Sequence, residues 1–196
     1  MTNTNATQDI NLKNNEKVNL YLVANDQKDI TKTINLSLKN NNEVNLYCLV
    51  LANAKNKIFN INFHHLGNNS TSNIYVKALA NNKATVKVNC VSSCATKTTK
   101  NTINQTIDGL IFDNNSLIQA LPCLDINIHE ITAKHTVNIG QVDPEIIFYL
   151  NTKGLSNLEA YQFLIDSFIN DLHPYLTKYK INVNKDIQTL MGGSYE

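Results

Sequence analysis

"HTVNIGQVDPEIIFYLNTKGLSNLEA", residues 135–160, divides the chain into two kinds of sequence. Before Gly140, apolar and polar residues alternate, as in a β-strand with one buried face. After it, residues 143–145 read Asp-Pro-Glu: an N-cap, a proline at the first helical position and an acidic first turn. The stretch therefore predicts a β body followed by helices.

Two helices are expected after this junction. The first ends at Gly154, which supplies the left-handed stop. Ser156 and Glu159 have the spacing of a capping box and open a second helix that ends near His173. Its apolar residues form one stripe, which predicts a helix with one face against the body: Tyr161, Leu164, Ile165, Phe168 and Leu172.

Upstream, from about residue 8 to 139, short segments of period two recur, such as "KVNLYLV" (17–23) and "TINLSLK" (33–39). "EVNLYCLVLA" (43–52) is apolar on both faces, as expected of a strand covered on both sides. Asn-rich corners separate the segments, and Asn tolerates the left-handed conformation that corners need. Because no fixed repeat length is visible, alternation alone fits a sandwich and a β-solenoid about equally.

Composition excludes several classes of protein. The net charge is +1 and every basic residue is Lys, so nucleic-acid binding is not expected. No apolar run approaches the roughly 20 residues that span a bilayer, and the polar N-terminus lacks a signal peptide's apolar centre. The four cysteines are expected as thiols in a reducing compartment. We therefore predict a cytoplasmic protein without membrane contact.

The junction resembles the C-terminal signature of the SufB/SufD family of the SUF iron–sulfur cluster assembly system. The segments "PCLDINIHEITAKH" (122–135) and "FHHLGNNSTSNIYVKALANN" (63–82) are similar to further parts of that family, so the resemblance covers roughly residues 55 to 172. The signature is carried by His135, Gly140, Asp143, Phe148, Tyr149, Leu150, Thr152, Lys153, Gly154, Leu155, Ser156, Glu159 and Ala160.

The resemblance implies a mainly β fold, a right-handed parallel β-helix with C-terminal α-helices, which favours the solenoid over the sandwich. The expected organisation is a β body over 1–140 (loose at 1–8), a helical pair over 141–175 and a tail over 176–196. The implied function is that of a scaffold subunit, not an enzyme. It would pair with a SufB-like subunit, form a homodimer when alone, and dock a SufC-like ATPase. The implied partner-binding residues are Phe148, Tyr149, Lys153, Gly154, Ser156 and Glu159.

Departures from the family pattern keep an alternative open. Family members usually carry an N-terminal helical region and more coils. Thr136 after the signature His is SufD-like, whereas Ser116 and Ala133 stand where SufB and SufD place cysteines. The alternative is a non-catalytic β-solenoid interaction module that binds the ATPase or oligomerises but no longer carries a cluster.

His135 is the candidate metal ligand. Imidazole is a good ligand for iron, and His ligates some iron–sulfur clusters, although the residue also fits a strand-end histidine that bonds a carbonyl. The resemblance places His135 at a subunit interface, where it would hold a transient iron–sulfur cluster only together with the partner. No nucleotide-binding motif is present.

Other candidate ligands are weaker. Cys90 and Cys94 are separated by three intervening residues and no second cysteine pair accompanies them, so they are expected in the core or at a corner. Neighbours on a strand point to opposite faces, so at most one of His64 and His65 can join a site. Three further residues are interpreted as structural, by packing for the first two and surface exposure for the third: Cys48, Cys123 and His129.

Overall fold

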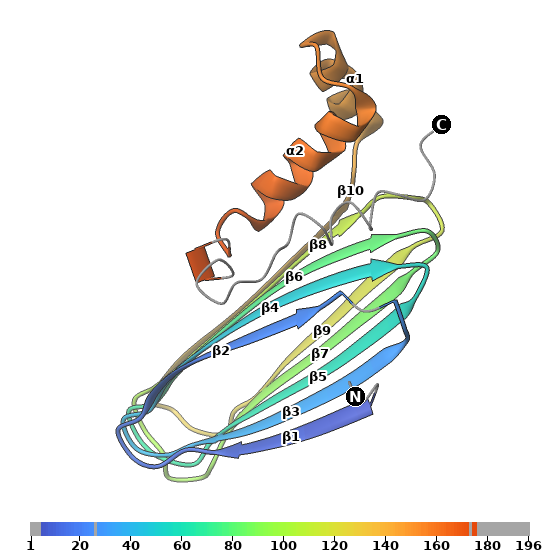
Figure 1. The fold of residues 1–196 in the computed structure, drawn as a ribbon. Coiled ribbons are helices and arrows are strands. Elements are labelled where there is room, and N and C mark those ends of the chain that lie inside the picture. The colour runs from blue at the N-terminus through green and yellow to red at the C-terminus, as the bar shows by residue number, and fades with distance from the viewer. Residues whose placement is uncertain (1–4, 26, 173, 176–196) are drawn as a thin grey trace.

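The computed structural model describes residues 5–175 except 26 and 173, and within them the chain forms a parallel β-solenoid of about five turns (Figure 1). Successive strands cross between two five-stranded sheets. The odd sheet has the order β1-β3-β5-β7-β9 and the even sheet β10-β8-β6-β4-β2. The prediction of a mainly β, parallel solenoid with C-terminal helices is confirmed.

The strands are short and similar in length. The odd sheet contains β1 (Asn5–Asn11), β3 (Ile30–Leu38), β5 (Asn56–His65), β7 (Thr85–Cys94) and β9 (Leu117–Asp125). The even sheet contains β2 (Lys17–Ala24), β4 (Glu43–Asn53), β6 (Thr71–Asn81), β8 (Asn101–Ile111) and β10 (Ile131–Gln141). Two helices follow, α1 (Pro144–Thr152) and α2 (Asn157–Ile169). β1 begins inside the range that was expected to be loose, and the predicted tail over 176–196 lies outside the described residues.

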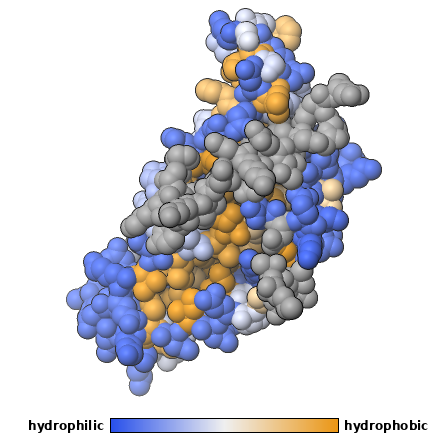
Figure 2. All heavy atoms as spheres, in the orientation of Figure 1, coloured by the Kyte–Doolittle hydropathy of each residue, from blue (hydrophilic) through white to orange (hydrophobic). Residues whose placement is uncertain are grey.

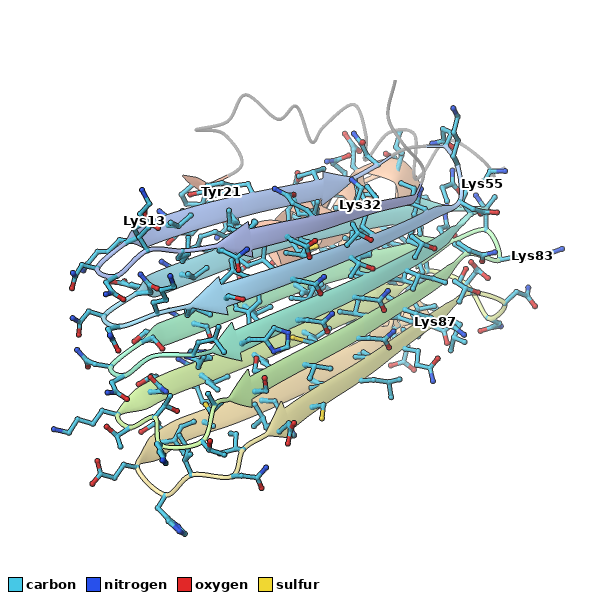
Figure 3. All side chains as sticks on the ribbon, turned by 90° about the horizontal axis from the view of Figure 1, so that it is seen from below. Lys13, Tyr21, Lys32, Lys55, Lys83 and Lys87 are labelled. Carbon is cyan, nitrogen blue, oxygen red and sulfur yellow. The ribbon has the colours of Figure 1, made fainter. Side chains whose placement is uncertain are left out.

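The coils differ in length, which explains why the sequence has no fixed repeat. Asn19 and Asn45, stacked in β2 and β4, are 26 residues apart. Near the other end of the solenoid, Ala84 and Ser116 bond each other across 32 residues. The strands stay in register while the corners between them lengthen. Figure 3 shows both sets of corners, with Lys13 at one end of the strands and Lys55 and Lys83 at the other.

Asparagine stacks in ladders from coil to coil. At one corner Asn15, Asn41 and Asn69 have φ of 64°, 59° and 56°, the left-handed region that Asn tolerates. The Asn41 side chain donates to Asn15 Oδ1 at 2.8 Å, and Asn69 donates to Asn41 Oδ1 at 2.9 Å. Each amide therefore bonds the identical residue of the neighbouring coil, as in cross-β assemblies.

A second ladder runs along the even sheet. Asn45 donates to Asn19 at 2.9 Å and Asn73 donates to Asn45 at 2.8 Å. Asn104 donates to Asn73 at 2.7 Å. The ladder fixes the parallel register of four strands on a face where packing alone would allow slippage.

The core lies between the two sheets, with a second apolar layer outside the even sheet. Leu36, Phe59 and Phe63 are buried in the interior. On the outer side of β4, Leu49 and Leu51 are buried with residues of α1 and α2. The prediction that residues 43–52 form a strand covered on both faces is confirmed. Figure 1 shows α2 lying across the even sheet.

Charged and aromatic contacts hold the helical pair to the even sheet. Lys77 on β6 forms ion pairs with Asp108 on β8 at 2.8 Å and with Asp171, just after α2, at 3.2 Å. The Lys77 Nζ also lies 4.8 Å from the centroid of the Phe168 ring. Tyr175 stacks on Tyr47 with ring centroids 3.9 Å apart. α2 ends earlier than predicted, because the N–H groups of Asn170 and Leu172 bond carbonyls three residues back.

Candidate binding surfaces

The last coil of the solenoid, formed by β9 and β10, leaves its inward-facing row uncovered among the described residues. Val137 and Ile139 on β10 pair in register with Ile107 and Gly109 on β8, positions that face the interior. Ile107 is fully buried, whereas Val137 is 37% and Ile139 38% exposed. The open end therefore presents an apolar strip with two strand edges, which is the kind of surface that natural proteins cover or pair.

His135 lies in this uncovered row. It is exposed, and its register partner in β8 is Gln105, which is 1% exposed. Gln105 crosses the interior: its Nε2 donates to Ser92 Oγ on β7 at 2.8 Å and to the Cys123 carbonyl on β9 at 3.3 Å. Its Oε1 has no partner among the described residues. Gln105 therefore joins the two sheets one layer beneath His135, which lies within β10 and not at the strand end.

The described residues contain no group of three or more His, Cys, Asp or Glu side chains that could hold a metal ion. Cys123 is exposed on β9, so its interpretation as a packing residue is wrong. Its register partner Val91 alternates with the buried Cys90 and Ser92, and the Cys123 side chain correspondingly points outward. As His135 is the only imidazole on β10, this chain offers at most an incomplete ligand set at its open end.

Two other cysteines are inert. Cys48 and Cys90 are fully buried in the core, and burial raises the pKa of each thiol to about 12. Cys94 is half-buried, and burial raises the pKa of its thiol. The expectation of core or corner positions for Cys90 and Cys94 agrees with this, and Cys48 packs as predicted.

His64 and His65 point to opposite faces of β5, as their adjacency predicted. His64 is half-buried, with Nδ1 2.8 Å from Ser93 Oγ. His65 is fully buried, with Nδ1 2.6 Å from Ser70 Oγ and Nε2 2.9 Å from Ser72 Oγ. Burial, assisted by the neighbouring His64, lowers the His65 pKa to about 4. His65 is therefore a neutral structural group with both nitrogens in hydrogen bonds.

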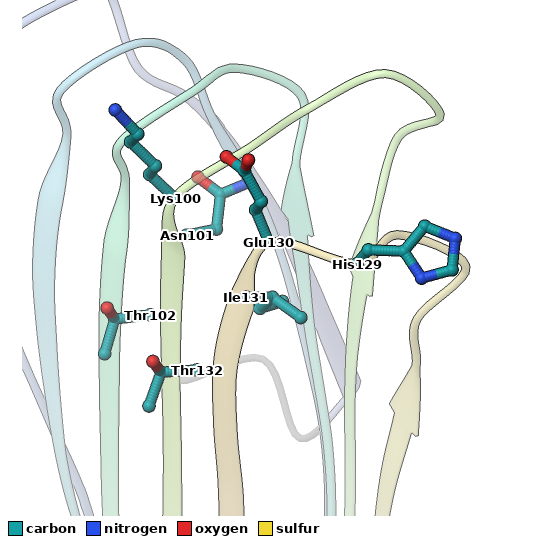
Figure 4. Close-up of a pocket in the computed structure, with 7 residues that line it drawn as sticks. All are labelled: Lys100, Asn101, Thr102, His129, Glu130, Ile131 and Thr132. Carbon is teal, nitrogen blue, oxygen red and sulfur yellow. The ribbon is translucent and has the colours of Figure 1, made fainter.

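A shallow hollow of about 500 Å³ opens at the corner before β10, lined by residues 100–102 and 129–132 (Figure 4). The Nδ2 atom of Asn101 is buried there without a partner among the described residues. Figure 4 shows the ring of His129 turned away from Lys100 and Asn101. His129 is exposed, as predicted, and His135 does not line the hollow.

Ser116, at the position where SufB-like sequences place a cysteine, has a structural role. Its hydroxyl donates to Asp113 Oδ2 at 2.5 Å and accepts from the Ala84 N–H at 3.1 Å. The residue therefore closes the corner between β8 and β9 and ties it to the coil before.

The helical pair carries a second surface. Phe148 on α1 is 70% exposed and Tyr149 is 58% exposed. The Lys153 Nζ lies 5.2 Å from the Tyr149 ring centroid. These are three of the six predicted partner-binding residues. This aromatic pair lies outside the core that the described residues form, and exposed aromatic residues of this kind are typical of interfaces.

The other three predicted residues shape the turn between the helices. Gly154 has φ +96° and ends α1. The Ser156 N–H donates to Glu159 Oε2 at 2.8 Å, and the Glu159 N–H donates to Ser156 Oγ at 3.3 Å. Hydrogen bonds from the Ser156 backbone and side chain hold the pKa of the Glu159 carboxyl below its usual range. The predicted capping box is present. Gly154, Ser156 and Glu159 therefore shape the turn that positions the aromatic pair, and they do not add to its exposed apolar area.

Sequence reasoning missed three exposed apolar residues on the pair: Ile146, Leu158 and Phe163. All three lie outside the buried stripe of their helices. Their position relative to this stripe could have indicated from the sequence that they are exposed. The predicted stripe on α2 is correct, since Ile165 is buried and the rest packs against the layer over the even sheet.

The fold is that of a parallel β-solenoid with a C-terminal helical pair, and its described residues contain no self-sufficient metal-ligand set. The family described as "SUF system FeS cluster assembly, SufBD core domain" matches residues 2–168. The chain therefore belongs to the SufBD family of the SUF iron–sulfur cluster assembly system.

Individual relatives agree with this assignment. The chain is 28% identical over 131 residues to the iron–sulfur cluster assembly protein SufB of Bacillus subtilis (strain 168). It has the same identity over the same length to iron–sulfur cluster assembly SufBD family proteins of Staphylococcus aureus strains USA300 and NCTC 8325. Each match covers 66% of this chain and 28% of the relative, so the chain spans less than a third of the proteins it matches. The SufD-like assignment from Thr136 stays a prediction.

Neither helix in the described part of the chain has the length and hydropathy that a membrane-spanning helix requires.

Proposed function

We propose that this chain is a non-enzymatic scaffold subunit of a cytoplasmic SUF-type assembly complex. It pairs with a SufB/SufD-like chain through its last coil and docks a SufC-like ATPase on its helical pair. The observation that carries the proposal is the uncovered row of β10, in which His135 is followed by the exposed apolar residues Val137 and Ile139. An imidazole on the exposed last coil can act as a ligand together with groups from a second chain that covers this coil.

Pairing through the last coil is supported by the strand edges and the apolar strip. Val137 and Ile139 follow His135 on the same row, so a partner that covers this row also covers the imidazole. A homodimer forms when the chain is alone, because a two-fold axis uses the same patch twice. In the complete complex a SufB-like chain takes the place of the second copy.

The cluster is the cargo of the complex, and His135 supplies one ligand to it. Iron–sulfur clusters are held mainly by several thiolates, with His as an occasional substitute. Cys48 and Cys90 are buried thiols whose raised pKa disfavours thiolate. The partner therefore supplies the thiolates, and the assembled interface holds the cluster transiently.

Docking of the ATPase is supported by the exposed aromatic pair of α1. Phe148 and Tyr149 offer apolar area, and Lys153 adds a charge beside it. Aromatic residues often carry most of the energy of an interface. The turn at Gly154 and Ser156 sets the angle at which α1 and α2 present this area.

Binding of the SufC-like ATPase tests this part of the proposal. Replacing both Phe148 and Tyr149 with Ser should weaken binding at least tenfold in a titration followed by calorimetry. The same replacement should leave the urea unfolding midpoint unchanged, since both side chains are mostly exposed. Gln162→Ser, at a half-buried position on α2, is the control. Unchanged affinity in the double variant would remove the helical pair from the ATPase interface.

One observation favours the alternative of an interaction module that carries no cluster. Ser116 is committed to the corner by hydrogen bonds with Asp113 and Ala84, so this position has a structural task in place of a thiol. The two candidate functions differ in the role of His135 alone. Both require the last coil and the helical pair to bind partners.

A further inference from the structure

The interior of the solenoid is mostly apolar, and Gln105 is one of the polar side chains inside it. Figure 2 shows apolar side chains gathered between polar rims at the end of the stack where β1 and β2 lie in Figure 1. Gln105 lies on the inward row of β8, between Ile103 and Ile107, and is 1% exposed. A buried amide needs hydrogen-bond partners for its carbonyl as well as for its N–H groups, because unsatisfied polar groups are unfavourable in such an interior.

Only the nitrogen of the Gln105 amide is satisfied. Nε2 carries two hydrogens, and it donates to Ser92 Oγ at 2.8 Å and to the Cys123 carbonyl at 3.3 Å. Both acceptors belong to the odd sheet, so these bonds set the position of the amide between the two sheets. Oε1 is buried and accepts no hydrogen bond from the described residues. The amide is therefore held in place with an unused acceptor.

The stack offers one side-chain donor for this oxygen. Gln105 lies between its register partners on the neighbouring strands, Ile74 of β6 and His135 of β10. Ile74 has no polar side-chain atom. Across the interior, Ser92 already accepts from Nε2, and the register partner of Ser92 on β9 is the apolar Leu124. Of these four neighbours, His135 is the one with a free N–H group to donate to Oε1.

We propose that Gln105 is a positioning residue for His135, in which Oε1 accepts a hydrogen bond from one ring nitrogen of the imidazole. Side chains of register partners on one face of a parallel sheet are separated by the strand spacing of about 4.8 Å, which an amide and an imidazole can bridge. The inference rests on the proposed function, in which a partner chain covers the row of His135. Covering removes water from the exposed imidazole, and the bond to Gln105 then takes the place of a bond to water.

This hydrogen bond determines which nitrogen of His135 is free to bind iron. A neutral imidazole carries one proton, and the nitrogen that donates to Gln105 keeps it. The other nitrogen has the lone pair, and it lies on the side of the ring away from Gln105, towards the covering chain. Metal-binding histidines generally donate their second nitrogen to a neighbouring acceptor, which fixes the ring orientation and the tautomer. Gln105 thus acts on the cluster only through His135.

Two nearly isosteric substitutions separate the acceptor from the link between the sheets. Gln105→Glu and Gln105→Met both remove the N–H groups that bond Ser92 and Cys123, but only Gln105→Glu keeps an oxygen that can accept from an imidazole. Nitrogen-15 NMR of histidine-labelled full chain, alone and with the SufB-like subunit and the ATPase, detects ring N–H groups that are protected from exchange. We expect a protected N–H on His135 with wild type and Gln105→Glu in the complex, and none with Gln105→Met.

His65 is the internal reference for the folded state. It is fully buried, with its ring nitrogens 2.6 Å and 2.9 Å from the hydroxyls of Ser70 and Ser72. Its ring N–H should therefore stay protected in every folded variant. If Gln105→Met lost the His65 signal as well, that variant would be unfolded, and the result would depend on wild type and Gln105→Glu, which should both keep the protected N–H of His135.

The iron and sulfide content of the complex under anaerobic conditions gives a functional readout. Gln105→Met should lower it severalfold, since loss of the outer partner of a metal-binding residue typically costs about 10–100-fold in metal affinity, whereas Gln105→Glu should stay close to wild type. Equal cluster content in the two folded variants would overturn the proposal.

Two NMR results would also overturn it. One is a protected N–H on His135 that persists in Gln105→Met, and the other is its absence from wild type both alone and in the complex. None of these outcomes removes the proposed role of His135 itself, which fails only if His135→Ala gives the wild-type cluster content.

Discussion

His135 lies in register with Gln105, on the same inward row of the solenoid, yet Gln105 is buried and His135 is exposed. The difference arises from position in the stack, because β8 is covered by β10 and no described strand covers β10. A row that forms core in one coil is thus exposed in the last one, and there the proposed partner chain would cover it.

Pairing through the last coil can be tested by charge. We expect Val137→Asp with Ile139→Asp to convert the homodimer to monomer, because each carboxylate would have to be desolvated at the interface. Thr136→Asp, on the neighbouring exposed position of the same strand, should leave the dimer intact. Sedimentation at tens of micromolar protein measures the outcome. A wild-type chain that is monomeric under these conditions would contradict pairing through this surface.

The turn between the helices should be sensitive to loss of its glycine. Gly154→Val is expected to destabilise the protein by about 1 kcal/mol or more, since a β-branched residue is disfavoured at φ +96°. A Cβ at this position would meet nothing within 4 Å, so the effect arises from the backbone alone. Urea unfolding gives the change in stability, and ATPase binding should weaken in parallel.

Gly140→Val is the control for the same side chain. A Cβ at Gly140 also meets nothing within 4 Å, and the residue lies on β10, where a β-branched side chain is favoured. If both variants lost the same stability, the left-handed cap would not be the cause.

Burial of His65 makes stability depend on pH. The folded-state pKa is about 4 against an ordinary value of 6.5, so the unfolded chain binds more protons between these values. The stabilisation is complete above pH 6.5 and is lost as the pH falls towards about 4. We expect wild type to lose about 2 kcal/mol more than His65→Gln between pH 7 and pH 5, from 1.36 kcal/mol per pKa unit. Equal losses in urea unfolding would show that His65 is protonated without penalty.

Much of the fold could be predicted because local signals and global fold agree. The N-cap at Asp143, the stop at Gly154 and the capping box at Ser156 depend on neighbours in sequence, and all three are present. Strand alternation identified the β body, but the choice of a solenoid came from the family resemblance. Alternation does not reveal which strands stack, and the changing coil length hides the repeat.

The binding surfaces were less predictable, because they depend on which coil is last. Cys123 was expected to pack, since Leu124 beside it is apolar, but at the terminal strand the outward position is exposed. The contacts of Lys77 with Asp108 and Asp171 join residues far apart in sequence, so no local pattern could indicate them. The Asn ladders likewise appear only once the coils are stacked.

We propose that His135 holds a cluster only together with a partner chain. Its most direct measurement is the anaerobic iron and sulfide content, with visible absorption, of wild type and His135→Ala, each alone and with a SufB-like subunit and the SufC-like ATPase. We predict little cluster on either chain alone, full assembly with wild type in the complex, and a clearly lower yield with His135→Ala at unchanged complex formation. A full cluster on the isolated chain, or an equal yield for the variant in the complex, would contradict the claim.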